Sequence, residues 1–267
     1  MADADFPTRA HDAFDRIEEQ FNLALDESLD PAGPDVLYEY VAQLGLAPGA
    51  VAVDVGSGRG RQAVELSRRF GLRVTGVDPV PQRAEGSREQ ALPGAVSFLA
   101  GTAEDLPVPS GSADLVWCRD VLSLVVDLGR AYREFRRVLR PGGRAVIYQM
   151  FATSALEPGE AAFLLPVLGC SAAAMRPENT EAAIAGAGLR VDRRVILGTQ
   201  WGEYAQEHGP QPGRHLLHAA RLIRDPDRYI SRFGKENYDI KVGDCLWHVY
   251  RMIGKLSGRV YLLSAPG

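Results

Sequence analysis

The sequence predicts an α/β fold: a doubly wound, mostly parallel sheet of seven strands with helices on both faces. Between residues 51 and 150, short apolar runs alternate strictly with amphipathic segments, which is typical of right-handed β–α–β crossovers. The run Val51–Val55 is almost wholly apolar, as expected of a central strand covered on both faces. The 267 residues are 46% hydrophobic and 24% charged, an ordinary composition for a chain with a packed core.

Two helices are expected before the first strand. Apolar residues recur at spacings of three and four over residues 11–25, the period of an amphipathic helix. Prolines and a glycine interrupt the pattern over residues 29–34, and a second helix is predicted from Val36 to Leu44. We expect residues 1–33 to form a helical cover over the ligand site.

The central segment, residues 34–150, contains most of the predicted sheet. The expected strands are 51–55, 73–77, 97–100, 113–118 and 144–150. The expected helices are 61–70, which ends at Gly71, 81–90, and 128–139, which stops at Pro141-Gly142-Gly143.

Residues 151–267 follow a less regular pattern. A helix is predicted over 177–187, a strand over 189–197, helices over 214–224 and 244–256, and a last strand over 260–263. Glycines, prolines and polar residues between Thr199 and Gly213 indicate a loop. The roughly sixty residues from 199 to 258 far exceed an ordinary connection of ~2–6 residues, so we expect a helical lid or acceptor wall within one domain, 1–267.

Charge and cysteine content exclude several classes of protein. The formal net charge is −4, so no overall basic field attracts nucleic acid, and no apolar run approaches the ~18 residues of a membrane span. Residues 1–9 are acidic and lack the apolar core of a secretory signal. Cys118, Cys170 and Cys245 are odd in number and far apart, which fits a reducing compartment, and we expect a cytoplasmic protein.

The sharpest local signal is the glycine-rich turn that follows the first strand. Gly56, Gly58 and Gly60 lack Cβ atoms, so the backbone can turn sharply and allow a ligand to lie against it. The turn leads into a helix N-terminus, whose free N–H groups favour anionic or polar groups. Many nucleotide-binding loops share such glycines, and a tight turn without a ligand is the alternative.

Asp78 ends the second predicted strand, twenty positions after Gly58. A carboxylate there can accept hydrogen bonds from both hydroxyls of a ribose, and it repels a 2′-phosphate, which disfavours an NADP-type ligand. The alternative role of a lone aspartate at this point is that of a helix cap.

Five motifs occur in order and at suitable distances: Asp54-Val-Gly-Ser-Gly-Arg-Gly60, Gly76-Val-Asp-Pro79, Ala103-Glu-Asp-Leu-Pro107, Asp114-Leu-Val-Trp117 and Arg133-Glu-Phe-Arg-Arg-Val-Leu-Arg-Pro-Gly-Gly143. As a set they resemble the class I S-adenosylmethionine-dependent methyltransferases, in their small-molecule, methyltransferase type 11-like branch. The resemblance covers about residues 35–150 and implies the Rossmann-like fold of that family.

The resemblance also implies roles for individual residues. Asp54 and the loop of Gly56, Ser57, Gly58 and Gly60 would hold the methionine end of the cofactor, with Asp54 reaching its ammonium group. Asp78 would bind the ribose hydroxyls. Further cofactor-binding residues are expected at Pro79, Thr102, Ala103 and Glu104, around the adenine, and at Cys118, Arg119 and Asp120, near the sulfonium and the acceptor. Relatives carry an aspartate where this chain has Thr102.

The acceptor side departs from the family. Relatives have one or two histidines shortly after the fourth strand, where this chain has Val121-Leu-Ser-Leu124, so the catalytic residue is unknown. The remaining candidates are His208, in the predicted loop, and His215, His218 and His248 on predicted helices. For these three a solvated polar helix face is the alternative. His215 and His218 lie three apart, but no neighbouring cysteine or third histidine completes a metal site, and we expect no metal.

The sequence therefore predicts methyl transfer from S-adenosylmethionine to a small organic acceptor, possible without a base when acceptor and methyl are held in line. A secondary metabolite is the expected class of acceptor. The sequence assigns neither the methylated atom nor an oligomeric state, monomer or homodimer. Two alternatives stay open: a non-catalytic S-adenosylmethionine binder, sensor or partner subunit, and an NAD-dependent oxidoreductase.

Overall fold

The computed structural model describes residues 6–80, 94–209 and 211–267. They form two compact units, Met1–Pro31 and Ala32–Gly267. The first unit contains α1 (Phe6–Leu25), which is longer than the helix predicted over 11–25. That residues 1–33 cover the ligand site stays a prediction, and the helix predicted over 81–90 lies outside the described residues.

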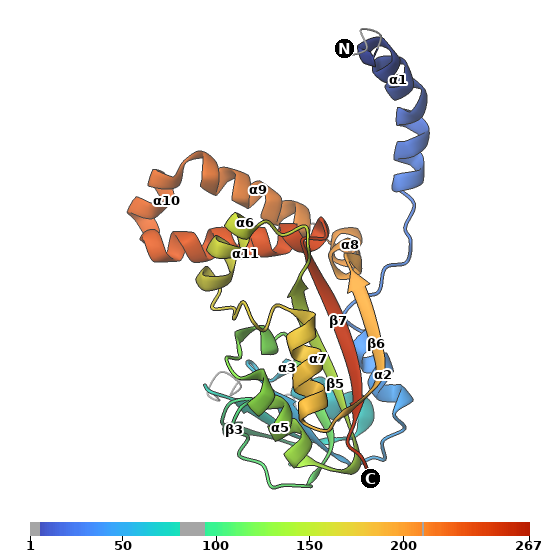
Figure 1. The fold of residues 1–267 in the computed structure, drawn as a ribbon, viewed down its shortest axis with the longest axis vertical. Helices are drawn as coiled ribbons and strands as arrows, with labels where there is room; N and C mark the ends of the chain where they lie inside the picture. The colour runs from blue at the N-terminus through green and yellow to red at the C-terminus, as the bar shows by residue number, and fades with distance from the viewer. Residues whose placement is uncertain (1–5, 81–93, 210) are drawn as a thin grey trace. The chain divides into compact units, whose positions relative to one another are not determined.

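The second unit is built on a seven-stranded sheet in the order β3-β2-β1-β4-β5-β7-β6 (Figure 1). The strands are β1 (Val51–Val55), β2 (Arg73–Asp78), β3 (Val96–Ala100), β4 (Ala113–Arg119), β5 (Leu139–Ala152), β6 (Arg190–Gly198) and β7 (Leu256–Ser264). Strands β1 to β5 pair in parallel, whereas β7 runs antiparallel to both β5 and β6. The predicted doubly wound, mostly parallel sheet is confirmed.

Side-chain alternation along β1 explains why helices cover both faces of the sheet. Val53 and Val55 belong to the apolar cluster formed with α5 (Leu128–Val138) and α7 (Pro177–Gly186). Ala52 points into the opposite cluster, formed with α2 (Val36–Gln43) and α3 (Arg61–Phe70). Because both faces are buried, the strand reads as a nearly continuous apolar run.

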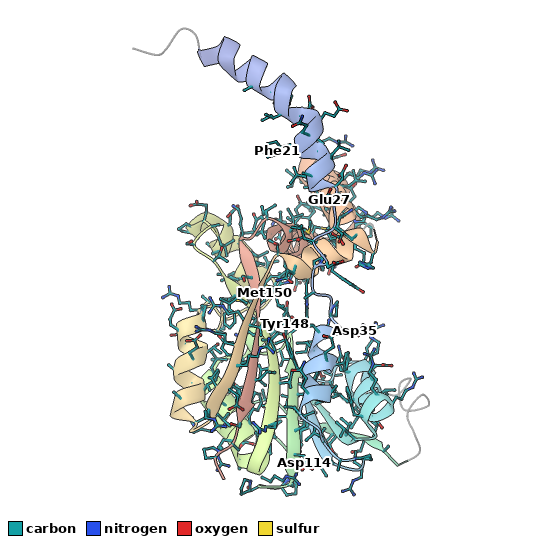
Figure 2. The ribbon with its side chains drawn as sticks, turned by 90° about the vertical axis from the view of Figure 1, so that its right-hand side faces the viewer. Phe21, Glu27, Asp35, Asp114, Tyr148 and Met150 are labelled. Carbon is teal, nitrogen blue, oxygen red and sulfur yellow. The ribbon has the colours of Figure 1, made fainter. Side chains whose placement is uncertain are left out.

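The amino ends and the carboxyl ends of the parallel strands differ in their polar contacts. Asp114, at the start of β4, is 4% exposed, accepts a hydrogen bond from the Val51 N–H at 2.7 Å and forms an ion pair with Arg140. Figure 2 shows it at the far end of the sheet from Tyr148 and Met150. Asp114 therefore fixes strand register at the amino ends, and the carboxyl ends are left for ligands.

One strand begins earlier than the sequence indicates. The helix predicted to reach Leu139 ends at Val138, and β5 starts at Leu139 instead of Arg144. Leu139 pairs with Ala113 and Arg144 with Leu115, so residues 140–143 bulge out of the ladder. Gly142 takes a positive φ of 73° there, which explains why Pro-Gly-Gly occurs inside a strand.

The predicted loop over 199–213 is wrong. The segment forms α8 (Gln200–Glu207) and the start of α9 (Gln211–Arg224). Gly202, which indicated a loop in the sequence, lies in α8. A glycine fits at this position because a Cβ there would come within 2.6 Å of Met252 Sδ. Its small size permits close helix packing.

Two further helices lie between β6 and β7: α10 (Pro226–Phe233) and α11 (Lys235–Met252), which begins earlier than predicted. One more helix, α6 (Pro158–Val167), follows β5. Figure 1 shows α8 to α11 gathered beyond the ends of β5 and β6. We call α8–α11 the helical insertion. None of the described helices is long and apolar enough to cross a membrane.

Candidate donor site and acceptor cavity

The glycine loop after β1 depends on backbone conformations that favour glycine. Gly56, Gly58 and Gly60 have φ values of 71°, 51° and 76°, all in the left-handed region. At Gly56 a Cβ would also lie 2.1 Å from Val121 Cγ2. The N–H groups of Gly56 and Ser57 donate to the Val77 carbonyl, at 2.8 and 3.1 Å, and hold the loop against β2. The loop leads directly into the N-terminus of α3, where free N–H groups can bind polar or anionic groups.

Asp78 lies directly beside this loop. Its Oδ2 accepts a hydrogen bond from the Gly58 N–H and its Oδ1 from the Val80 N–H, each at 2.9 Å. The side chain is 8% exposed and is held rigidly by these two donors. Each carboxylate oxygen has more than one acceptor site, so a vicinal diol can still bind to the carboxylate. The structure brings together the two features that the sequence paired by spacing.

Asp54 is a buried carboxyl group with spare hydrogen-bonding capacity. It is 2% exposed, and its Oδ2 has no hydrogen-bond partner among residues 6–80, 94–209 and 211–267. Burial, with a smaller contribution from Asp78, raises the pKa of Asp54 to about 7, against the opposing effects of the Ala63 N–H and Arg119. An ammonium group at this oxygen would stabilise the charged carboxylate and lower the pKa again.

The residues predicted around an adenine follow β2 and β3. Thr102 and Asp105 pair through two backbone hydrogen bonds of 3.3 and 3.2 Å, and Ala103 inside this turn is buried. Glu104 Oε1 accepts the Asp127 N–H at 3.0 Å, so this carboxylate also anchors the start of α5. Pro79 is exposed next to Asp78.

The end of β4 places three predicted residues in different surroundings. Burial, and then the charges of Asp54 and Asp120, raise the pKa of the Cys118 thiol, which favours the neutral thiol. Arg119 Nε lies 3.5 Å from Asp120 Oδ2. Asp120 takes a positive φ of 59°, a strained conformation for a residue with a Cβ, and turns the chain at the sheet edge.

A cavity of about 340 Å³ opens among α8, α9 and α11. Trp201 in its wall stacks on Tyr148 of β5, with ring centroids 3.9 Å apart and planes 19° apart. Arg251 Nη2 donates to the Trp201 carbonyl at 3.0 Å. The lining residues are Pro34, Trp201, Gly202, Tyr204, Ala205, His208, Gly209, Gln211, Pro212, His248 and Arg251.

This cavity adjoins the end of β4. The Arg119 guanidinium lies 5.1 Å from the centroid of the Trp201 ring. Half of the Asp120 side chain is accessible, yet partial desolvation raises its pKa, and the charges of Arg119 and Arg251 oppose this shift. Asp120 therefore faces charges from both the sheet and the insertion, at the edge of this cavity.

The four candidate histidines fall into three places. His208 caps α8, instead of lying in a loop, and its ring stacks on Tyr204 at 4.0 Å. His248 lines the same cavity, and its side chain is 32% exposed. His215 stacks on His248 with centroids 4.0 Å apart, so these two are not simply solvated polar positions.

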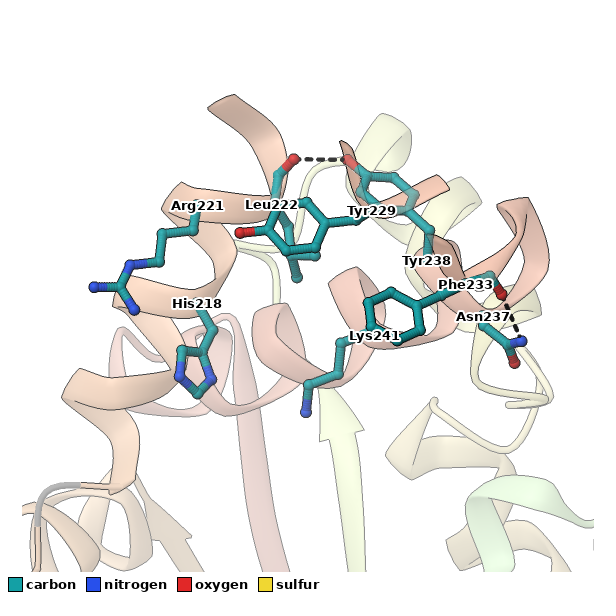
Figure 3. Close-up of a pocket in the computed structure, with 8 residues that line it drawn as sticks. All are labelled: His218, Arg221, Leu222, Tyr229, Phe233, Asn237, Tyr238 and Lys241. Carbon is teal, nitrogen blue, oxygen red and sulfur yellow. Dashed lines mark hydrogen bonds between the residues drawn. The ribbon is translucent and has the colours of Figure 1, made fainter. Parts of the chain in front are cut away.

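His218 lines a second, larger cavity of about 470 Å³ in the outer part of the insertion (Figure 3). Its other lining residues are Arg221, Leu222, Tyr229, Phe233, Asn237, Tyr238 and Lys241. None of them belongs to the predicted cofactor site, and the cavity lies among α9, α10 and α11. The larger cavity thus lies apart from the predicted cofactor residues, whereas the 340 Å³ cavity adjoins the end of β4.

Part of the chain matches known proteins. Residues 53–147 match the family model described as a methyltransferase domain. The chain is 31% identical to methyltransferase GfsG of Streptomyces halstedii over 137 residues, 49% of each chain. It is 30% identical to the 27-O-demethylrifamycin SV methyltransferase of Amycolatopsis mediterranei over 128 residues, 46% of this chain and 47% of that protein.

The chain is therefore similar over residues 53–147 to methyltransferase domains, in agreement with the resemblance found in the sequence. It spans about half the length of the curated relatives named above. Among solved structures, the [4+2]-cyclase SpnF superposes with a TM-score of 0.68 at 22% identity, over 90% of this chain and 86% of SpnF. This likeness shows the shared fold.

The residues around the glycine loop have a chemistry that fits S-adenosylmethionine. The unpartnered Asp54 Oδ2 offers an acceptor for the amino-acid ammonium, and the doubly anchored Asp78 offers acceptors for the ribose diol. Val121 packs against the backbone at Gly56, where a Cβ would clash, whereas the backbone at Gly58 has open space beside it.

Two residues near the acceptor cavity did not stand out in the sequence. They are Arg251 and Asp244, both on α11. Their i, i+3 and i, i+4 spacing from His248 places all three on one face of α11, which is a signal the sequence contains. The packing of that face against α9 and α8 was not predictable from spacing.

Proposed function

We propose that this protein transfers the methyl group of S-adenosylmethionine to a small organic acceptor bound in the 340 Å³ cavity. The observation that carries the proposal is the pair of carboxylates at the tips of β1 and β2. Asp78 is fixed by the Gly58 and Val80 N–H groups, and Asp54 beside it retains an unpartnered oxygen. The match of residues 53–147 to a methyltransferase-domain model supports the same proposal.

Positioning supplies the main catalytic effect in this proposal. The cofactor, when bound, provides a methyl group already activated by its sulfonium. The glycine loop and Asp78 orient the donor, while Trp201 and Tyr204 give the acceptor cavity flat apolar walls. Holding two reactants in line can contribute ~7–11 kcal/mol to lowering the barrier.

A proton acceptor is available where the acceptor must lose a proton. His208 Nδ1 lies 2.9 Å from the Tyr204 carbonyl, so it carries the hydrogen and leaves Nε2 as the acceptor nitrogen. His208 lines the cavity, and we propose that it can accept a proton from a hydroxyl or an amine there.

The acceptor class is a metabolite, and a secondary metabolite is favoured. The printed name of the Amycolatopsis relative specifies a demethylrifamycin as its substrate. A cavity of this volume lies within the ~300–1,000 Å³ that enclose small molecules. We further propose a cytoplasmic protein that does not act on nucleic acid, because its three cysteines are free and its net charge is −4.

Binding and turnover together test the proposal. Calorimetry should show S-adenosylmethionine and S-adenosylhomocysteine binding and no binding of NAD. Asp78→Ala should weaken donor binding ~10- to 100-fold, since hydrogen bonds to a charged group contribute ~1.5–3 kcal/mol. Asp35→Ala, at a carboxylate with 68% of its side chain exposed, should leave donor binding unchanged.

Transfer of an isotope-labelled methyl group to a panel of hydroxylated and aminated metabolites then decides the reaction. Donor binding without transfer to any of them would favour a sensor or partner subunit. Conversion of a metabolite without gain of the labelled methyl would indicate a different reaction on the same fold, as the name of SpnF illustrates. Binding of NAD alone would favour an oxidoreductase.

A further inference from the structure

Three potential metal ligands meet between α9 and α11. His215 belongs to α9, and Asp244 and His248 lie four residues apart on one face of α11. One ligand atom from each side chain lies within 4.8 Å of those of the other two. Sequence reasoning had paired His215 with His218, but those two rings are 6.5 Å apart, and the partner of His215 is His248.

The hydrogen bonds around the cluster leave suitable atoms available. His215 Nδ1 lies 2.7 Å from the Gln211 carbonyl, which can only accept, so Nδ1 carries the hydrogen and Nε2 offers a lone pair. A backbone carbonyl on the second ring nitrogen is the usual partner of a metal-binding histidine. His248 Nε2 lies 3.8 Å from Asp244 Oδ1, beyond hydrogen-bonding distance.

Asp244 shares its carboxylate with a competing cation. Lys241 Nζ lies 2.6 Å from Oδ2, and Arg251 lies about two turns after Asp244 on α11. The Lys241 ammonium engages Oδ2, so Oδ1 remains on the side of His248. These cations weaken the attraction for a divalent ion, so moderate affinity is expected.

The geometry points to a divalent transition-metal site formed by His215, Asp244 and His248, with Zn²⁺ as the reference ion. Two imidazoles and one carboxylate form a ligand set that Zn²⁺ accepts, with bond lengths of ~2.0–2.2 Å. Binding requires the three ligand atoms to close from within 4.8 Å to about 3.5 Å, and the stacked rings of His215 and His248 to turn toward one ion. His248 also lines the acceptor cavity, so the remaining coordination positions lie at its edge.

Metal titration of the tag-free full chain tests this site independently of methyl transfer. Calorimetry with ZnCl₂ should show one ion per chain. His215→Ala and Asp244→Asn should each weaken binding by at least ~10-fold, because losing even a supporting partner costs ~10–100-fold. His218→Ala, at the neighbouring histidine of the same helix, is the matched control and should leave binding unchanged.

Co²⁺ substitution gives a spectroscopic check. Visible d–d bands without a thiolate charge-transfer band are expected, and they should disappear in His215→Ala. A thiolate band would instead assign the ion to Cys118, Cys170 or Cys245 and overturn the proposal. It is also overturned if no ion binds at one per chain, or if His218→Ala weakens binding as much as His215→Ala does.

Discussion

Backbone atoms build the proposed donor site at the ends of β1 and β2, whereas side chains from separate helices build the proposed acceptor cavity. In the donor site, the N–H groups of Gly58 and Val80 donate hydrogen bonds to Asp78. The glycine loop is held by hydrogen bonds to the Val77 carbonyl. In the cavity, Trp201 stacks on Tyr148 and Arg251 supports the Trp201 carbonyl. The first arrangement depends on local chain conformation, and the second depends on which elements pack together.

The contrast suggests how the two regions tolerate change. A single added atom can prevent a backbone loop from adopting its ligand-binding conformation, because the closely packed backbone around it cannot move aside. A cavity lined by side chains can adjust by changing rotamers, so its occupant can differ while the donor stays the same. Substitutions in each region test this difference.

The largest effect is expected at the junction of the two regions. Trp201→Ala removes a 3% exposed side chain that packs on Tyr148 and should lower the free energy of unfolding by ~3–5 kcal/mol. Urea denaturation measures this loss. Trp201→Phe keeps a ring on Tyr148 and should lose less than half as much; an equal loss would mean that the stack is not what holds the insertion.

Gly56→Ala should break the donor cradle. The new Cβ would meet Val121 Cγ2 at 2.1 Å with φ at 71°, so we expect a loss of ~2–4 kcal/mol from overpacking and left-handed strain together. Calorimetry should detect no donor binding. Gly111→Ala has a similar φ of 61° but open space at its Cβ and should retain normal donor affinity.

The raised pKa of Asp54 predicts pH dependence of opposite sign for folding and for donor binding. The native pKa of about 7 exceeds the ordinary 3.8, so the contribution of Asp54 to stability is complete below pH 4 and is lost as the pH rises to about 7. The ionised form binds the donor ammonium, so donor affinity should increase over the upper part of the same range.

Asp54→Asn removes both pH dependences if Asp54 causes them. Donor binding should weaken by ~1.5–3 kcal/mol at pH 8, the value of a hydrogen bond to a charged group. Calorimetry between pH 5 and pH 8 measures this. A variant that retains the pH dependence of the parent chain would assign it to another group.

The smallest effect is expected when a glycine of the helical insertion is replaced by alanine. At Gly202→Ala the new Cβ would meet Met252 Sδ at 2.6 Å, but this is a flexible side chain, and alanine favours a helix by ~1 kcal/mol over glycine. The net change in unfolding free energy should stay within ~1 kcal/mol, with normal donor binding. A loss as large as that of Gly56→Ala would remove the distinction between the two regions.

The parts that could be predicted from sequence are those with short-range causes. Gly71 ends α3 with a φ of 66°. Asp78 lies beside Gly58 because the tight turn, the helix and the strand between them fix the distance between these two residues. The loop predicted over 199–213 failed because glycine and proline frequencies do not distinguish a turn from a helix packed closely at Gly202. The bulge at residues 140–143 was missed for a similar reason, since β-strand pairing decides where it lies.

The amino-acid sequence by itself determined the alternating strands and helices, the glycine cradle and the two carboxylates of the donor site. These follow from hydrophobic periodicity and from backbone conformations that only particular residues adopt. Only the tertiary structure decided that Trp201 reaches Tyr148, and that His215 meets His248 and Asp244 instead of His218. Those contacts join segments far apart in the chain, and the free energy of packing whole helices selects them.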